Sequence, residues 1–216
     1  MQHVALLVIA KEPLPGAAKT RLCPPCSPQQ AATLATAALL DTLAAVALTP
    51  ARRKVLVFGG DARRWCPDGF EVIPQRGAGL GQRLAAAFQD VEGPALVVGM
   101  DTPQLTPQLL LEGLHALAQP AVDAILGRAL DGGYWSVGLK TGGAQAFDDV
   151  PMSCAVTWSR QRERLRELGL RVHDQRTLRD VDTIGDARAV ALQAPDSRFA
   201  QALASIDRST PVWVDR

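Results

Sequence analysis

Short aliphatic runs that stop at glycine, proline or aspartate alternate along this chain with segments of helical character. The first run, Val4 to Ala10, ends in a loop rich in proline, which predicts a strand buried on both faces. A helix is expected next, because Ser27 and Pro28 provide an N-cap and a first-turn proline for an alanine- and leucine-rich segment up to Leu48. This order of elements is typical of an α/β fold.

The same alternation continues along the rest of the chain. Further strands are expected at 54–58, 72–74, 95–99, 122–127, 134–139 and 170–173. Further helices are expected at 82–91, 107–117 and 156–168, and then up to about residue 206. The pattern predicts one domain over residues 1–216, a three-layer α/β/α sandwich with a mostly parallel central sheet in which 134–139 is antiparallel.

Composition excludes several classes of protein. Of the 216 residues, 47% are hydrophobic and 21% are charged, which argues against disorder. Lys and Arg together number 23 against 22 Asp and Glu, so the chain lacks the basic field of a nucleic-acid binder. No uninterrupted apolar run reaches the ~18 residues of a membrane span, and no basic segment precedes the first run. We therefore expect a cytoplasmic protein with no integral membrane segment.

Ligands of open parallel sheets bind beyond the carboxyl ends of the strands, so the loops after the expected strands are the candidate sites. The first loop combines the small residue Gly16 with two cations, Lys19 and Arg21. Glycine lets a backbone approach a ligand closely, and the cations would neutralise phosphate oxygens. A solvated basic loop is the alternative explanation. The spacing matches neither a P-loop nor a dinucleotide-binding motif.

Carboxylates and glycines follow the later strands. Asp101 ends the expected strand 95–99, where it can hold Mg²⁺ or Mn²⁺ against phosphates or simply cap the following turn. Asp131 precedes two glycines, a pattern that a type I′ hairpin turn also explains. Asp182 would complete a metal site with Asp101 if the fold brings them together. A glycine-rich loop at 75–84 opens a helix whose N-terminus favours an anion or a polar base edge.

Cys23 and Cys26 have the CxxC spacing of a redox pair or of half a zinc site. The remaining cysteines and histidines form no second pair at a spacing that suits zinc. A redox or metal role for this motif stays open as a minor alternative to phosphate binding by the same loop.

Six motifs together resemble a known bacterial family: KEPLPGAAKTRL, QRGAGLGQRL, GMDTP, DGGYWSVGL, the Trp158-Ser159 pair and DVDT, in this order. They are similar to the nucleotide-diphospho-sugar transferase superfamily with the Rossmann-like GT-A fold, in particular to the arsenosugar-biosynthesis-type glycosyltransferases, formerly a domain of unknown function. A more distant resemblance links the chain to the guanylyltransferases of cofactor biosynthesis. The motifs span residues 4 to about 190.

The resemblance implies a role for each motif residue. Residues implied to bind the nucleotide are Lys11, Pro15, Gly16, Lys19, Arg21, Gly79, Gly81 and Arg83. Residues implied for the sugar or acceptor pocket are Gly132, Gly133, Tyr134 and Trp158. Asp101 stands where GT-A enzymes hold the metal, but Pro103 replaces the second aspartate of the usual Asp-x-Asp. Asp182 is therefore the first candidate for the missing ligand, and Asp131 is the second.

The resemblance predicts a glycosyltransferase that uses Mg²⁺ or Mn²⁺ and moves a sugar from a nucleotide-diphospho-sugar to a small-molecule acceptor. Lys19 and Arg21 would stabilise the leaving group, and Asp131 would act as base toward the acceptor. A nucleotidyltransferase that uses a nucleoside triphosphate and releases pyrophosphate needs the same residues, so it stays as the alternative. A nucleotide-sugar-binding protein without turnover is a third possibility.

Overall fold

The computed structural model describes residues 3–141 and 143–209, and its centre is a seven-stranded sheet in the order β3-β2-β1-β4-β6-β5-β7. The strands are β1 (Ala5–Lys11), β2 (Lys54–Gly59), β3 (Glu71–Pro74), β4 (Ala95–Gly99), β5 (Ala124–Ala129), β6 (Tyr134–Leu139) and β7 (Val172–Leu178). Only β6 runs antiparallel to its neighbours β4 and β5 among these strands. The mostly parallel sheet and its one antiparallel strand are both confirmed.

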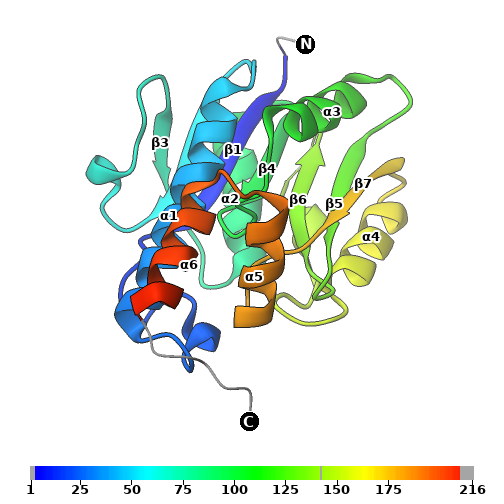
Figure 1. The fold of residues 1–216 in the computed structure, drawn as a ribbon. Helices are drawn as coiled ribbons and strands as arrows, with labels where there is room; N and C mark the ends of the chain where they lie inside the picture. Colours follow the sequence, from blue (N-terminus) through cyan, green and yellow to red (C-terminus); the bar gives the residue numbers. More distant parts are fainter. Residues whose placement is uncertain (1–2, 142, 210–216) are drawn as a thin grey trace.

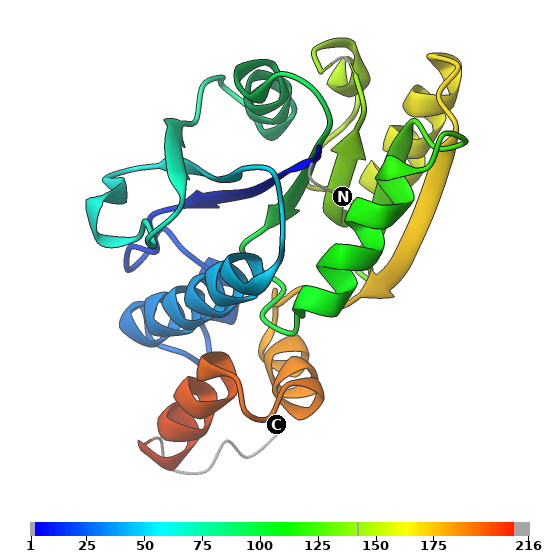
Figure 2. The same ribbon diagram turned by 90° about the horizontal axis from the view of Figure 1, so that it is seen from above.

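The described residues also form six α-helices and three short 3₁₀ helices. They are α1 (Pro28–Leu48), α2 (Leu80–Val91), α3 (Pro107–Ala118), α4 (Thr157–Glu167), α5 (Ile184–Gln193) and α6 (Arg198–Ser209), with η1 (Thr20–Leu22), η2 (Ala62–Arg64) and η3 (Gln145–Phe147). Figure 2 shows α1 and α3 on one face of the sheet and α2 and α4 on the other. The three expected layers are therefore present, and α5 and α6 add a further layer outside α1.

Helix α1, with 21 residues, is the longest helix in the described part of the chain, and it is rich in alanine and leucine. Ser27 and Gln30 close its N-terminus with a capping box, as the Ser27-Pro28 pair predicted. By length and composition alone α1 is able to cross a membrane, but most of it is buried. One side packs on the sheet and the other on α5 and α6 (Figure 1). Such burial on two sides is typical of a core helix, so we interpret α1 as one.

The strands at the β5–β7 end of the sheet depart most from the expected elements. Strand β7 was expected at 170–173 but extends over Val172–Leu178, and β5 begins two residues later than expected. Most side chains of β7 are exposed at the sheet edge, so this strand lacks the aliphatic run that marks the central strands. The C-terminal Val212-Trp213-Val214 stretch lies outside the described residues.

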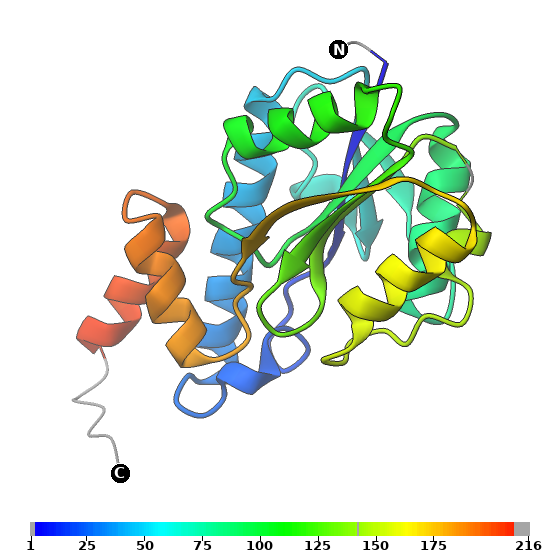
Figure 3. The same ribbon diagram turned by 90° about the vertical axis from the view of Figure 1, so that its right-hand side faces the viewer.

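The topology brings four loops to one edge of the sheet. The segments after β1, β4 and β7 all follow the carboxyl ends of parallel strands, and the β5–β6 turn joins them because β6 runs back from that edge. Figure 3 shows the β1–α1 loop and the β5–β6 turn at this common lower edge. Every sequence motif with candidate chemistry except the CxxC pair borders this edge.

The carboxylate of Asp41 fastens α6 to α1. Its Oδ1 accepts from the backbone N–H of Arg198 at 3.1 Å and its Oδ2 from that of Phe199 at 2.9 Å. The first turn of a helix has free N–H groups and a partial positive charge, so a buried carboxylate there caps it well. Phe199, fully buried, then packs against α1.

We expect Asp41→Ala to lower the free energy of unfolding by about 1–2 kcal/mol, because the N–H groups of Arg198 and Phe199 in the first turn of α6 lose their carboxylate partner. Urea denaturation followed by circular dichroism measures this change. The exposed Asp148 supplies a matched control, since Asp148→Ala removes a carboxylate that caps no helix. Equal stability of the two variants would contradict the role of Asp41.

Candidate functional site

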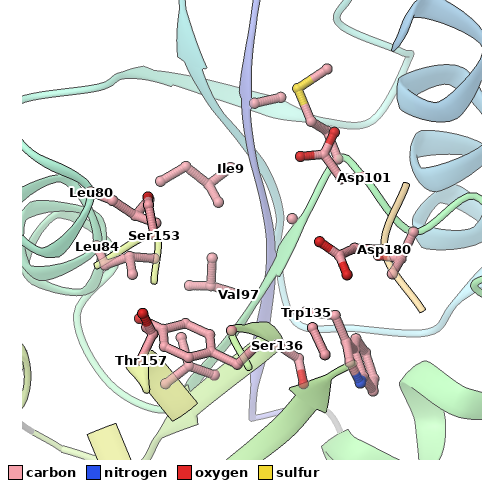
Figure 4. A pocket seen from close by; sticks show the side chains of 18 of the residues that line it. Ile9, Leu80, Leu84, Val97, Asp101, Trp135, Ser136, Ser153, Thr157 and Asp180 are labelled. Carbon is pink, nitrogen blue, oxygen red and sulfur yellow. The ribbon is translucent and has the colours of Figure 1, made fainter. Parts of the chain in front are cut away.

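A cavity of about 470 Å³ opens at the carboxyl edge of the sheet. Its two halves differ in chemistry, as Figure 4 shows: Ile9, Leu80, Leu84 and Val97 line one side, and carboxylates line the other. A smaller cavity of about 220 Å³ lies under the β1–α1 loop. Lys11, Arg21, Met100, Asp101 and Asp182 border both cavities. The large cavity has the size of a small-molecule site.

Three carboxylates meet on the acidic side of the cavity. Asp131 comes from the β5–β6 turn, and Asp180 and Asp182 follow β7. One oxygen of each lies within 4.8 Å of the others, which allows the three to hold one metal ion. Carboxylate oxygens are the ligands that Mg²⁺ and Mn²⁺ prefer. The fold thus brings together the two candidates Asp131 and Asp182, with Asp180 between them.

The proximity of these carboxylates makes Asp180 a weaker acid. Burial, followed by the negative charges of Asp131 and Asp182, raises the pKa of Asp180 to about 6. Like charges in a partly desolvated site disfavour ionisation, and a bound cation would remove that penalty. The donor set therefore fits a hard divalent cation.

Asp101, the position at which the resemblance implied the metal, has a different partner. Its Oδ1 lies 2.9 Å from the ammonium Nζ of Lys19. The backbone carbonyl of Asp101 also accepts from the N–H of Val181 at 3.0 Å. Asp101 thus lines the same cavity but belongs to an ion-pair network beside the three-carboxylate cluster, and its role as a metal ligand stays a prediction.

Lys19 lies at the centre of that network. Its side chain is only 8% exposed, and Nζ contacts Asp101, Asp182 at 3.5 Å and the carbonyl oxygen of Val181. Burial alone would lower the pKa of Lys19, but the charge and hydrogen bond of Asp101, with help from Asp182, outweigh it and raise that pKa. The ammonium is charged and directed at carboxylates.

Two other cations of the same loop are more accessible to a ligand. Arg21, with a side chain 70% exposed, pairs with Asp182 Oδ2 at 2.8 Å and lines both cavities. Lys11, at the end of β1, donates to the carbonyl of Ala17. Gly16 turns the loop with a φ of +77°, a conformation that favours glycine. Pro15 is exposed on the loop and, like Gly16, lies outside the lining of either cavity.

The apolar side of the cavity is formed by the first turn of α2 and the sheet. Gly79 precedes α2 as its N-cap without a side-chain cap, and Arg83 lines the cavity and donates to the carbonyl of Gly77. Gly81 instead faces Met152 and Phe147. The amide nitrogen of Gln75 donates to the carbonyl oxygen of Ala10, and its amide oxygen accepts from Arg83.

The turn that carries Asp131 is held by the start of α4. A Cβ on Gly132 would lie 2.0 Å from the carbonyl oxygen of Ala155, and φ of Gly132 is +92°. The N–H of Trp158 donates to the carbonyl of Gly132 at 2.8 Å. Asp131 itself accepts from the N–H of Gly133 and has no positive φ, so the turn is not type I′. Close packing therefore fixes Asp131.

Residues implied for the sugar or acceptor pocket separate into two groups. Gly133 and Tyr134 line the cavity, and burial raises the pKa of Tyr134, whose hydroxyl donates to Gln161 Oε1. Trp158 lies outside the lining, with its ring near the guanidinium groups of Arg128 and Arg162 at 5.2 and 5.7 Å. Trp158 thus supports the Asp131 turn from behind.

Sequence reasoning passed over two residues of this site. Asp180 was noted only as part of the Asp180-Val181-Asp182 stretch, although two acids at i and i+2 after a strand were a signal for it. Gln75 begins the predicted glycine-rich loop 75–84 but received no role, because its position depends on hydrogen bonds to distant strands.

The CxxC pair lies apart from the carboxylate cluster. Cys23 and Cys26 are free thiols, and Cys26 is buried against α1 and α6. Burial and the neighbouring Cys23 raise the pKa of Cys26, which makes its thiol less reactive. The redox alternative gains no support from this environment.

A family profile matches the greater part of the chain. The family is described as "Uncharacterized protein conserved in bacteria (DUF2064)", and the match covers residues 30–154. A search of curated proteins finds no match.

Solved structures share the fold. A protein from Desulfovibrio desulfuricans G20, provisionally named a nucleotide-diphospho-sugar transferase, is 26% identical with a TM-score of 0.86, and 96% of each chain is covered. CMP:2-keto-3-deoxy-manno-octonic acid synthetase, complexed with CTP, is 12% identical with a TM-score of 0.60, covering 90% of this chain and 100% of that one. Rv0371c of Mycobacterium tuberculosis H37Rv, complexed with manganese, is 20% identical with a TM-score of 0.51, covering 88% and 97%. The predicted nucleotide-diphospho-sugar transferase fold is confirmed.

The raised pKa of Asp180 predicts how stability depends on pH. An acid whose pKa is higher in the folded than in the unfolded state binds its proton more tightly when folded, so a rise in pH between the two values weakens folding. In EDTA, Asp180→Asn should match the wild type near pH 4 and exceed its free energy of unfolding by on the order of 1–2 kcal/mol above pH 6, after allowance for solvent screening. Urea titrations across this range measure the difference, with Asp148→Asn as the control. A difference that is independent of pH would contradict the prediction.

Proposed function

The chain belongs to the DUF2064 family, and we propose that it is a metal-dependent glycosyltransferase that takes a sugar from a nucleotide-diphospho-sugar and transfers it to a small acceptor. The broader class, a nucleotide-dependent transferase, is the one its structural neighbours represent. The narrower arsenosugar-biosynthesis type stays a prediction from the sequence motifs.

One observation carries this proposal: carboxylates and loop cations face the same cavity beyond the carboxyl ends of the strands. Asp131, Asp180 and Asp182 suit a divalent cation, while Lys11 and Arg21 suit phosphate oxygens. A site for a metal-bound diphosphate needs both kinds of charge within reach of one ligand.

The proposed metal is Mg²⁺ or Mn²⁺, held by Asp131, Asp180 and Asp182. Support comes from the oxygen-only donor set and from the manganese bound by Rv0371c, a protein of the same fold. Such a cation, when bound, stabilises the negative charge that develops on a leaving nucleoside diphosphate.

The remaining roles belong to the protein's own residues. Arg21 and Lys11 bind the phosphates, and the first turn of α2, which brings Leu80 and Arg83 into the cavity lining, binds the base or ribose. Asp131 is fixed by the Gly132–Ala155 contact, and the carboxylate oxygen of Asp131 that does not hold the metal accepts the proton of the acceptor hydroxyl. Tyr134 and Gly133 border the sugar and shield it from water.

Nucleotidyl transfer is the alternative, because a triphosphate would use the same cations and carboxylates. It is favoured by one observation, the CTP bound by a synthetase of this fold. A nucleotide-sugar-binding protein without turnover is the second alternative, and hydrolysis or transfer of the donor distinguishes it from an enzyme.

A thermal-shift screen tests the proposal, since a ligand that binds the folded state raises the melting temperature. We expect one nucleotide-diphospho-sugar to stabilise the protein in Mg²⁺ or Mn²⁺ and much less in EDTA. Stabilisation by a nucleoside triphosphate alone would instead favour nucleotidyl transfer. No shift with any sugar nucleotide or triphosphate would contradict both.

The carboxylate cluster makes a second prediction. Asp182→Asn should abolish the metal-dependent part of the shift, because it removes one of three ligand carboxylates, and affinity for Mn²⁺ should fall at least about tenfold. Asp61→Asn, at an exposed aspartate paired with Arg63, is the control. Asp101→Asn runs in parallel, and loss of the same shift would add Asp101 to the ligands. Wild-type behaviour of Asp182→Asn would contradict the assignment of the cluster.

A further inference from the structure

Both oxygens of the Asp182 carboxylate are already paired with cations of this chain. Lys19 Nζ lies 3.5 Å from Oδ1, and Arg21 Nη1 lies 2.8 Å from Oδ2. The same carboxylate is one of the three that converge at the proposed metal site. A metal ion and two side-chain cations thus have one carboxylate in common.

Lys19 and Arg21 differ in burial and in the number of their contacts. Lys19 is buried, and its ammonium is surrounded by Asp101, Asp182 and the carbonyl of Val181. Its backbone adopts a φ of +49°, and its side chain, only 8% exposed, points inward to Asp101. Arg21 is 70% exposed and pairs with Asp182 from the solvent side. Lys19 is the fixed counter-ion and Arg21 is the movable one.

Positive charge within a few ångströms opposes the entry of a divalent cation. Salt screens charges in a partly buried site less than charges at the surface, so this repulsion persists at ordinary ionic strength. The Lys19 and Arg21 charges therefore weaken the attraction of the cluster for a free metal ion. They also neutralise Asp101 and Asp182, whose like charges would otherwise repel each other.

We propose that Lys19 and Arg21 are built-in counter-ions that compete with the divalent cation for Asp182. This rests on the metal site of the proposed function. A free metal ion must displace these contacts unaided, whereas a metal that arrives with a diphosphate also supplies oxygen atoms that the released cations can bind. The site thereby favours the metal–nucleotide complex over the metal alone. Lys19, predicted from the sequence to bind phosphates, would do so only when the metal–nucleotide complex is bound.

Direct titration of Mn²⁺ without nucleotide tests the competition, with the free ion followed by its electron paramagnetic resonance signal. Lys19→Met removes the charge and keeps an unbranched side chain, so we expect Mn²⁺ to bind about tenfold more tightly than to the wild type. Lys54→Met is the matched control, because Lys54 lines neither cavity and donates to the backbone carbonyl of Ala47. Its affinity for Mn²⁺ should stay within about twofold of the wild type.

Thermal stability gives a second readout, which should fall in the variant whose Mn²⁺ affinity rises. Without metal, Lys19→Met should melt at a lower temperature than the wild type, because Asp101 and Val181 lose a buried partner. Lys19→Arg, which keeps the charge, should return the Mn²⁺ affinity toward the wild-type value. Arg21→Gln changes an exposed side chain, so we expect it to leave folding unaffected. It should also tighten Mn²⁺ binding, because it removes the second cation from Asp182.

The outcomes separate this inference from the function it rests on. Tighter Mn²⁺ binding in Lys19→Met and in Arg21→Gln supports the competition. Unchanged or weaker binding in Arg21→Gln and in a folded Lys19→Met overturns it, while the metal site of the wild type still stands. Absence of Mn²⁺ binding in the wild type and in all variants overturns the proposed metal site and the competition together.

Discussion

The ion pair between Lys19 and Asp101 joins segments that are remote in the sequence. Lys19 belongs to the loop after β1, Asp101 to the end of β4, and the carbonyl of Val181 to the segment after β7. The backbone bond from Val181 to Asp101 adds a second link between the last two. Because Lys19 is buried, removal of either partner would leave an uncompensated charge, which proteins tolerate poorly. The ammonium group of Lys19 therefore links the segments that follow β1, β4 and β7 at this edge of the sheet.

The topology explains why these segments meet. Parallel strands β1 and β4 are neighbours, so their following loops leave the same edge side by side. The antiparallel β6 returns the chain, so the Asp131 turn projects from that edge as well. Val181, buried among α1, α5 and α6, anchors the remaining carboxylates to the outer helical layer. Charge placement in the site thus follows from strand order and from the packing of one valine.

Local chemistry allowed much of this fold to be predicted. Strand β4 lies at the expected residues 95–99, since an aliphatic run buried on both faces has an unambiguous pattern. Strand β7 was placed too early, because the polar side chains of an edge strand carry no such pattern. In the site, Asp131 and Asp182 were recognised from their motifs, but Asp180 was left out. Its importance comes from burial and from like-charged neighbours, which depend on tertiary contacts.

The central claim is that a divalent cation and a nucleotide diphosphate share the cavity at the carboxyl edge of the sheet. A crystal structure of the protein grown with Mn²⁺ and a nucleoside diphosphate, with anomalous scattering to locate the metal, tests it most directly. We expect a manganese peak bounded by Asp131, Asp180 and Asp182, with the diphosphate between that peak and Arg21. A metal bound elsewhere, or a nucleotide outside this cavity, would contradict it.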